Sequence, residues 1–168
     1  MDNDMQRLID QLAIQQVLAR YARGADRGDT ELLTGVYWED SIDNHGPMVG
    51  NGYEYAKGMA ERLPTIYHAT FHHLGQTCFL KMEPTRVACE TYFMSAKRNV
   101  DVSQPGHMTY GRYYDLFEKR NGEWKIFRRD VIFDICQPMS PETAFVPGQT
   151  LGRRDRQDPS YRPPGSNS

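Results

Sequence analysis

The chain has 168 residues, 39% of them apolar and 11% aromatic, which is enough for one globular domain with a sizeable core and predicts no second domain. Acidic and basic residues are well mixed and the formal net charge is −2, so the sequence shows no basic surface for nucleic acid or an anionic membrane. This balance favours a neutral or weakly charged small ligand as the partner.

Two further counts bear on where the protein works. No apolar run approaches the ~20 residues that cross a bilayer, so we expect no membrane insertion. The three cysteines are an odd number and have no metal-ligand spacing, which argues against a disulfide framework. We therefore expect Cys78, Cys89 and Cys136 to be buried thiols of a soluble, cytoplasmic protein.

The N-terminal part predicts helices. Apolar residues recur at intervals of three and four from Asp4 to Arg27, as an amphipathic helix requires, and Gly28 ends this helix. Asp29 is placed to cap a short second helix, because its side chain can accept hydrogen bonds from the free N–H groups of a first turn.

Residues 41–66 predict two further elements. Ser41 to His45 is a short strand that ends at a Gly-Pro turn. A third helix is expected from Gly52 to Leu63, with Pro64 ending it because proline lacks the N–H of a helical hydrogen bond.

After Pro64 the chain is rich in Thr, Tyr, Phe, Val and Ile, which is typical of strands. Turn residues divide it, and Asn121-Gly122 is the clearest hairpin signal. Four strands of an antiparallel meander are predicted: His68–Met82, Arg86–Val100, His107–Lys119 and Glu123–Ile135. Helices followed by a meander indicate an α+β domain in which helices cover one face of a curved sheet.

We assign residues 1–138 to this domain and residues 139–168 to a tail rich in proline and glycine. Because the tail keeps several apolar residues, its first half is expected to pack across the mouth of the domain or onto a neighbouring subunit. Its final stretch, Arg162–Ser168, is expected to remain mobile.

One histidine is a candidate base. Strand alternation places His72 on one face with Leu74, whereas its neighbour His73 points to the other face. Histidine suits proton transfer near neutral pH because its unperturbed pKa is ~6.5. The alternative is a buried core histidine with satisfied hydrogen bonds.

Asp26 is a candidate partner for His72. It lies at the edge of the apolar stripe of the first helix, near a C-terminus where the helix dipole disfavours a carboxylate. The alternative is an exposed acid paired with Arg23 or Arg27. If Asp26 reaches His72, the two form a dyad in which the carboxylate orients the imidazole and stabilises its protonated form.

Arg129 is the third candidate. Alternation places it with apolar residues of the last strand, where an uncompensated charge is costly and an anionic partner or ligand is needed. It could stabilise negative charge that develops on a substrate, or form a structural ion pair. The shared face is predicted to hold Phe127, Val131, Phe133 and Ile135.

Other polar residues are weaker candidates. Four tyrosines are possible hydroxyl donors to a substrate, or packing residues: Tyr21, Tyr37, Tyr92 and Tyr110. Asp43, Asn44 and His45 form either a polar rim or an ordinary loop. We find no Gly-rich phosphate loop, no nucleophile elbow and no convincing metal cluster in the sequence.

Four short runs resemble the SnoaL-like branch of the nuclear-transport-factor-2-like superfamily over about residues 5 to 138: Ala25-Asp26-Arg27, Tyr37-Trp38-Glu39-Asp40, Tyr67–His72 and Asn121–Lys125. The mechanistic analogues in this superfamily are lyases of the hexachlorocyclohexane dehydrochlorinase and, more distantly, scytalone dehydratase type. The resemblance implies a cone-shaped α+β barrel with an apolar pocket, no cofactor and a homo-oligomer such as a dimer or trimer. It also implies that Asp26, His72 and Arg129 are the catalytic residues.

The sequence thus leads to the hypothesis of a cofactor-independent lyase. His72, oriented by Asp26, would remove a proton and drive loss of water, halide or formaldehyde from a cyclic or aromatic small molecule, lignin-derived aromatics among them. The alternatives are an isomerase of the ketosteroid type and a non-catalytic module of the same fold that binds a small ligand or another protein.

Overall fold

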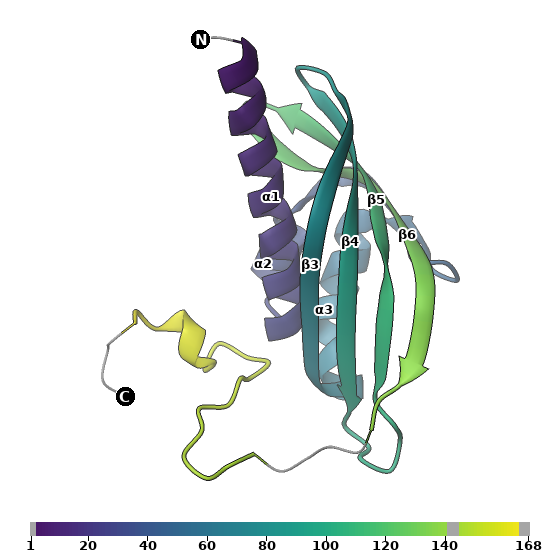
Figure 1. Ribbon diagram of the computed structural model, residues 1–168, viewed down its shortest axis with the longest axis vertical. Helices are drawn as coiled ribbons and strands as arrows, with labels where there is room; N and C mark the ends of the chain where they lie inside the picture. The colour runs from purple at the N-terminus through teal and green to yellow at the C-terminus, as the bar shows by residue number, and fades with distance from the viewer. Residues whose placement is uncertain (1–2, 141–144, 165–168) are drawn as a thin grey trace.

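A computed structural model of the chain describes residues 3–140 and 145–164. The elements follow in the order α1 (Asn3–Arg27), α2 (Thr30–Thr34), β1 (Tyr37–Asn44), β2 (Val49–Asn51), α3 (Gly52–Ile66), β3 (Tyr67–Met82), β4 (Arg86–Asn99), β5 (His107–Arg120), β6 (Glu123–Pro138) and the short 3-10 helix η1 (Pro159–Tyr161). Figure 1 shows α1 running alongside β3, with α3 behind the strands and the tail leaving the end of β6.

The α+β class is confirmed, and the sheet differs from a closed antiparallel barrel in two respects. Its strand order is β2-β1-β6-β5-β4-β3, so β2 and β3 are free edges and the curved sheet is open. Strand β1 pairs with β6 in parallel, whereas the other pairs are antiparallel. A parallel pair is possible here because a long stretch of chain, including α3 and four strands, connects β1 to β6.

Local signals account for most element boundaries. Gly28 follows α1 with a φ of 62°, a left-handed conformation that suits glycine. The Asp29 side chain accepts the N–H of Leu32 and caps α2 as predicted. Asn121 and Gly122 both have positive φ, 51° and 85°, which is the geometry of a type I′ hairpin.

The predicted end of the third helix is wrong. Helix α3 continues through Pro64 to Ile66. Pro64 stands in the last turn, so its missing N–H removes one hydrogen bond while its fixed φ remains helical. Tyr67, which follows Ile66, is the C-cap of the helix, and its N–H donates to the Leu63 carbonyl.

The predicted strand faces are correct only up to irregularities in the pairing. His72 lies inward and His73 outward, but the register shifts between Leu74 and Thr77. Beyond this shift Cys78 is exposed, as is Cys136 near the end of β6, so Cys89 is the one buried thiol of the three. A bulge reverses the side-chain alternation by adding one residue to one strand.

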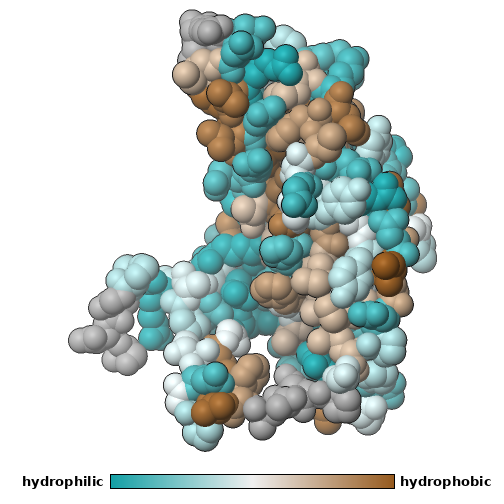
Figure 2. Space-filling model, viewed as in Figure 1, coloured by the Kyte–Doolittle hydropathy of each residue, from teal (hydrophilic) through white to brown (hydrophobic). Residues whose placement is uncertain are grey.

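Apolar residues of α1, α2, α3 and the inner face of the sheet form the core. Other apolar side chains remain exposed, and Figure 2 shows them on the N-terminal part of α1. There Met5, Leu8, Ile9 and Leu12 are 52%, 56%, 43% and 62% exposed. None of the helices in the described ranges is long and apolar enough to cross a bilayer.

The close approach of β5 to β6 at Gly111 yields a stability prediction. A Cβ atom on Gly111 would lie 2.2 Å from the Ile132 carbonyl oxygen and 3.0 Å from the ring of Phe93. We expect Gly111→Ala to destabilise the domain by about 1–3 kcal/mol, as overpacking does. Gly58→Ala is the control, because this exposed position of α3 has open space and Ala favours helix by roughly 0.5–1 kcal/mol. Urea unfolding of both variants measures the difference, and equal stability would contradict the close approach.

Candidate functional site

Asp26 and His72 lie together, α1 contributing the first and β3 the second. His72 Nδ1 is 2.7 Å from Asp26 Oδ1, and the His72 backbone N–H donates to Asp26 Oδ2 over 2.8 Å. Thr70 donates its hydroxyl to the same carboxylate over 3.1 Å. With Asp26 ionised, Nδ1 carries the proton and the lone pair remains on Nε2.

The alternative partners of Asp26 are engaged elsewhere. Arg27 pairs with Asp158, and Arg23 donates to Ser160 of the tail. Asp26 is buried, with 7% of its surface exposed, so it is not the exposed acid that the sequence left open.

His72 lines a cavity between the helices and the inner face of the sheet. Apolar and aromatic side chains form much of its wall, among them Met59, Leu63, Phe93, Tyr113, Val131 and Phe133. The polar lining consists of Tyr21, His45, Tyr55, His72, Ser95 and Lys97. The cavity volume is about 60 Å³, room for a few water molecules, so a ring-sized ligand requires side chains of the wall to move.

Arg129 lies behind this wall. It is completely buried and donates from Nε and Nη2 to both oxygens of Asp115, over 2.8 and 2.7 Å. Its guanidinium carbon lies 4.2 Å from the ring centre of Tyr21 and 4.0 Å from that of Tyr113. Burial opposes the charged form, yet the pKa of Arg129 is raised well above its usual value because Asp115 stabilises the charge. The ion pair considered from the sequence is therefore present, and the two tyrosine rings line the cavity where Arg129 does not.

The face predicted around Arg129 also needs a correction. The register of β5 against β6 shifts between Leu116 and Phe117, so Trp124 and Ile126 are the buried residues before the shift. Phe127 is therefore not on the face of Arg129. Val131 and Phe133 are on that face and line the cavity, Phe133 with 53% of its surface exposed, whereas Ile135 is 57% exposed and does not line it. The irregularity adds a residue to β6 and changes the side-chain alternation.

The four candidate tyrosines separate into two groups. Tyr21 lines the cavity, and Tyr37 is buried one step behind it, with its hydroxyl donating to Asp43. Tyr92 and Tyr110 lie on the outer face of the sheet and do not line the cavity, Tyr92 being 53% exposed. The inward neighbours on these two strands are Phe93 and Tyr113, which stack with ring centres 4.4 Å apart.

A second histidine, His45, lines the same cavity and contacts a buried carboxylate, although an ordinary loop was the preferred interpretation of this segment from the sequence. His45 Nδ1 contacts Asp43 Oδ1, and Tyr37 donates its hydroxyl to Asp43 Oδ2 over 2.6 Å. The His45 ring stacks on Tyr55 of α3, with ring centres 4.5 Å apart. The signal was available in β1, where Ser41 and Asp43 alternate with outward Ile42; the polar set, not the apolar residue, faces inward.

Burial shifts the pKa of two further lining groups. The pKa of Tyr21 is raised to about 12, mainly by burial, so its hydroxyl keeps its proton at neutral pH. Burial also lowers the pKa of Lys97. Sequence reasoning missed Lys97 and Ser95, which lie on the inner face of β4. Within the described ranges, no three His, Cys, Asp or Glu side chains are grouped as metal ligands.

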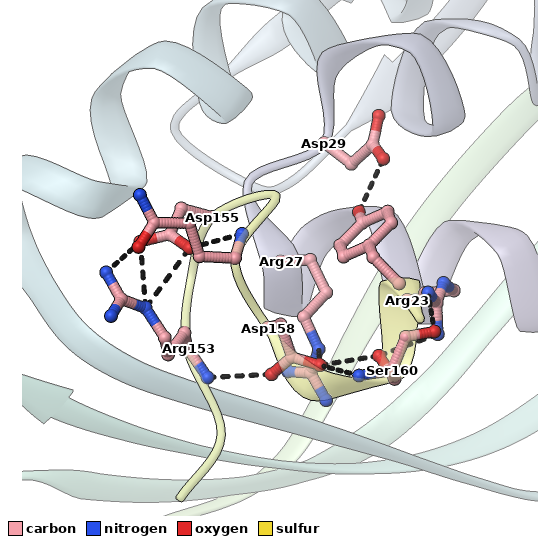
Figure 3. A network of polar contacts seen from close by, with 9 residues as sticks. Arg23, Arg27, Asp29, Arg153, Asp155, Asp158 and Ser160 are labelled. Atoms are coloured by element: carbon pink, nitrogen blue, oxygen red, sulfur yellow. Dashed lines mark hydrogen bonds and ion pairs between the residues drawn. The ribbon is translucent and has the colours of Figure 1, made fainter. Parts of the chain in front are cut away.

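The tail docks behind the dyad. Arg154 donates to the Thr70 hydroxyl and, over 3.0 Å, to the carbonyl of Ala25. Figure 3 shows the adjoining network, in which Asp158 of the tail meets Arg27 of α1. Tyr161 donates its hydroxyl to Asp29 over 2.5 Å.

These hydrogen bonds and ion pairs to α1, Asp29 and β3 all come from the second half of the tail. In the first half Phe145 and Val146 are 63% and 67% exposed, although Phe145 and Leu151 line a second pocket beside Phe71. None of the described tail residues lines the cavity around His72. Packing of the first half across the mouth of the domain is therefore not seen at the cavity around His72 among the described residues, and packing onto a neighbouring subunit stays a prediction. Residues 141–144 and 165–168, to which the tail expectations also extend, lie outside the described ranges.

Comparison with known proteins identifies the domain. The SnoaL-like domain family matches residues 6–130. The chain belongs to this family. The resemblance drawn from the four short sequence runs is thereby confirmed. No curated protein matches the chain.

Solved structures share the fold of this SnoaL-like domain. A hexachlorocyclohexane dehydrochlorinase, LinA type 2, is 21% identical with a TM-score of 0.78, covering 88% of this chain and 100% of that chain. LinA type 3 from Novosphingobium barchaimii LL02 is 20% identical with a TM-score of 0.75, covering 86% and 99%. A candidate scytalone dehydratase from Novosphingobium aromaticivorans DSM 12444 is 22% identical with a TM-score of 0.75, covering 88% and 99%.

The buried ion pair yields a second stability prediction. Asp115→Ala leaves the charge of Arg129 buried without a partner, which should destabilise the domain by about 3–5 kcal/mol. Asp130→Ala is the control, because its partner Arg128 is half exposed and such pairs contribute less than about 1 kcal/mol. Urea unfolding measures both. The double variant Arg129→Met, Asp115→Leu should recover much of the loss, and a small effect of Asp115→Ala alone would contradict the argument.

Docking of the tail should depend on pH. Burial alone would raise the pKa of Asp158, but hydrogen bonds from Ser160 and the Arg153 N–H, with the charge of Arg27, lower it to about 2. The stabilisation is complete above the unfolded pKa of ~3.9 and is lost as the pH falls towards the folded value.

Hydrogen exchange of the Arg153 and Ser160 amides measures this docking. In the wild type, protection of these amides should fall as the pH is lowered from ~4 to ~2. In Asp158→Asn, protection should already be low at neutral pH. Asp155→Asn is the control, because the Asp155 side chain accepts hydrogen bonds from Arg153 and Gln157 of the same turn and, within the described ranges, none from α1. Unchanged protection in Asp158→Asn would show that Asp158 does not hold the tail.

Proposed function

We propose that this SnoaL-like protein is a cofactor-independent lyase that eliminates a small leaving group from a cyclic or aromatic molecule. The observation that carries the proposal is the dyad: Asp26 holds His72 by Nδ1, leaving Nε2 free of any partner among the described residues, in a largely apolar cavity. A base with its lone pair directed by a buried carboxylate is suited to removing a proton from carbon.

In this mechanism His72 Nε2 takes the proton and Asp26 stabilises the imidazolium. The electron pair of the broken C–H bond forms the double bond, and the leaving group departs with its own pair. Tyr21 keeps its proton at neutral pH and serves as a hydrogen-bond donor where negative charge develops. Arg129 acts through the rings of Tyr21 and Tyr113, against which its guanidinium lies.

The wall of the cavity supports an apolar ring as the substrate. Phe93 and Tyr113 offer a stacked aromatic surface, and Phe133 stands edge-on to Phe93 at a centre distance of 6.4 Å. Water, halide and formaldehyde remain the candidate leaving groups, with lignin-derived aromatics among the candidate substrates. The names of the structural neighbours, a dehydrochlorinase and a candidate dehydratase, are consistent with elimination.

The proposal includes a homo-oligomer, a dimer or trimer, in the cytoplasm. Its support is the set of exposed apolar side chains on α1, which a second subunit would remove from water. The three free cysteines agree with a reducing compartment.

Mass spectrometry of products is the test. The substrate panel contains scytalone, hexachlorocyclohexane, lignin-derived diaryl compounds and a steroid-like ketone. His72→Gln should lower turnover at least ~100-fold, the low end of general-base contributions. Asp26→Asn should also lower it, because an amide stabilises the imidazolium less than a carboxylate does.

His73→Gln is the matched control, since it removes an exposed histidine from the outer face of the same strand. Circular dichroism verifies that each variant is folded. Near-native turnover in folded His72→Gln would contradict the proposal. A product of unchanged mass would favour the isomerase, and ligand binding without any turnover would favour the non-catalytic module.

A further inference from the structure

Two histidine–carboxylate pairs face one cavity from opposite edges of the sheet. His72 belongs to the edge strand β3, whereas His45 directly follows β1, which lies beside the other edge strand. Both histidines line the cavity, and each holds a buried carboxylate through Nδ1. The proposed mechanism uses His72 and leaves His45 without a role.

The environment of His45 is built around its ring. The Asp43 side chain is fully buried and accepts a hydrogen bond from Tyr37 in addition to its contact with His45. Tyr55 of α3 covers one face of the imidazole, with an angle of 21° between the two rings. The ring is therefore fixed by a carboxylate, a stacking partner and the end of β1, as a group that transfers a proton needs to be.

The second nitrogen of His45 is the atom available for a ligand. Nδ1 contacts Asp43, and Nε2 has no hydrogen-bond partner among the described residues. A purely structural histidine in this turn would need only the Asp43 contact. Because the ring also lines the cavity, Nε2 can meet a molecule bound beside His72.

We infer that His45 is the second proton-transfer residue of this cavity, and that Asp43 is its positioning residue. The inference rests on the proposed lyase function and deepens it: the natural substrate has a leaving group that needs a proton, such as a hydroxyl. A halide departs as a stable anion and needs none.

The protons balance across the two pairs. His72 Nε2 takes a proton from carbon, the carbon–carbon double bond forms, and the carbon–oxygen bond breaks. Protonated His45 gives its Nε2 proton to the departing oxygen, which leaves as water. His72 then returns its proton to solvent and His45 takes one from solvent, which restores both.

The first arm of the test compares two leaving groups. Elimination of water from scytalone should fall at least ~100-fold in His45→Gln, the low end of general-acid contributions, and elimination of chloride from hexachlorocyclohexane by less than ~10-fold. His72→Gln should impair both reactions alike, and His73→Gln neither. Equal losses for the two substrates in folded His45→Gln, or no loss for either, would overturn the role of His45. His45→Asn is the second variant if the first does not fold.

The second arm does not depend on turnover. 4-Nitrophenol, whose absorbance changes on binding and deprotonation, is the probe for a hydroxyl at Nε2. Its affinity should weaken about three- to tenfold in His45→Gln, the equivalent of one hydrogen bond, and stay unchanged in His73→Gln.

The two arms separate the two proposals. If the protein binds 4-nitrophenol through His45 but transforms no member of the substrate panel, the lyase function fails while His45 remains a ligand-binding residue. Equal affinity in wild type and His45→Gln would overturn the inference even if elimination is found. No binding and no turnover would contradict both.

Discussion

The buried ion pair of Arg129 with Asp115 is the interaction around which the cavity is built. It joins β5 to β6, and the guanidinium lies against the rings of Tyr21 from α1 and Tyr113 from β5. A buried charge of this kind persists only with a well-placed partner, since desolvation of both groups is costly. The pair therefore fixes two tyrosines that line the cavity, and the stability of the fold and the shape of the site depend on the same contact.

The inner face of the sheet carries polar groups where packing alone would favour apolar ones. Asp43, Ser95 and Thr109 are at most 5% exposed on three different strands. Burying such groups has a cost that hydrogen bonds only partly offset, so their clustering near one cavity is better explained by chemistry than by stability. The edge strand β3 likewise places a polar residue, His72, on the inner face of the sheet. A cavity with polar groups at opposite edges and aromatic rings between them suits a ligand that has an apolar body and polar ends.

Local signals made much of the fold predictable, and long-range contacts account for the errors. The helix end at Gly28 and the hairpin at Gly122 were predictable because both need a positive φ, which glycine adopts without steric cost in any protein. The contact between Asp26 and His72 was predictable because a carboxylate near a helix C-terminus is locally unfavourable and needs a partner that stabilises it. The orientation of Phe127 could not be predicted from the sequence, because the bulge that reverses the side-chain alternation in β6 depends on pairing with the neighbouring strand. His45 was named only as part of a possible polar rim, because strand alternation was inferred from apolar residues and the inward residues at the end of β1 are polar.

The tail places a charged residue, Arg154, beside the dyad from outside the family-matched region. The match to the SnoaL-like family ends at residue 130, whereas Arg154 lies beyond it and donates to Thr70, which itself donates to Asp26. Burial lowers the pKa of Arg154, and the nearby carboxylate of Asp26 partly offsets this effect. The tail thus contacts both elements that carry the dyad, β3 through Thr70 and α1 through the carbonyl of Ala25, so the position of the Asp26–His72 pair depends on a segment outside the family-matched region.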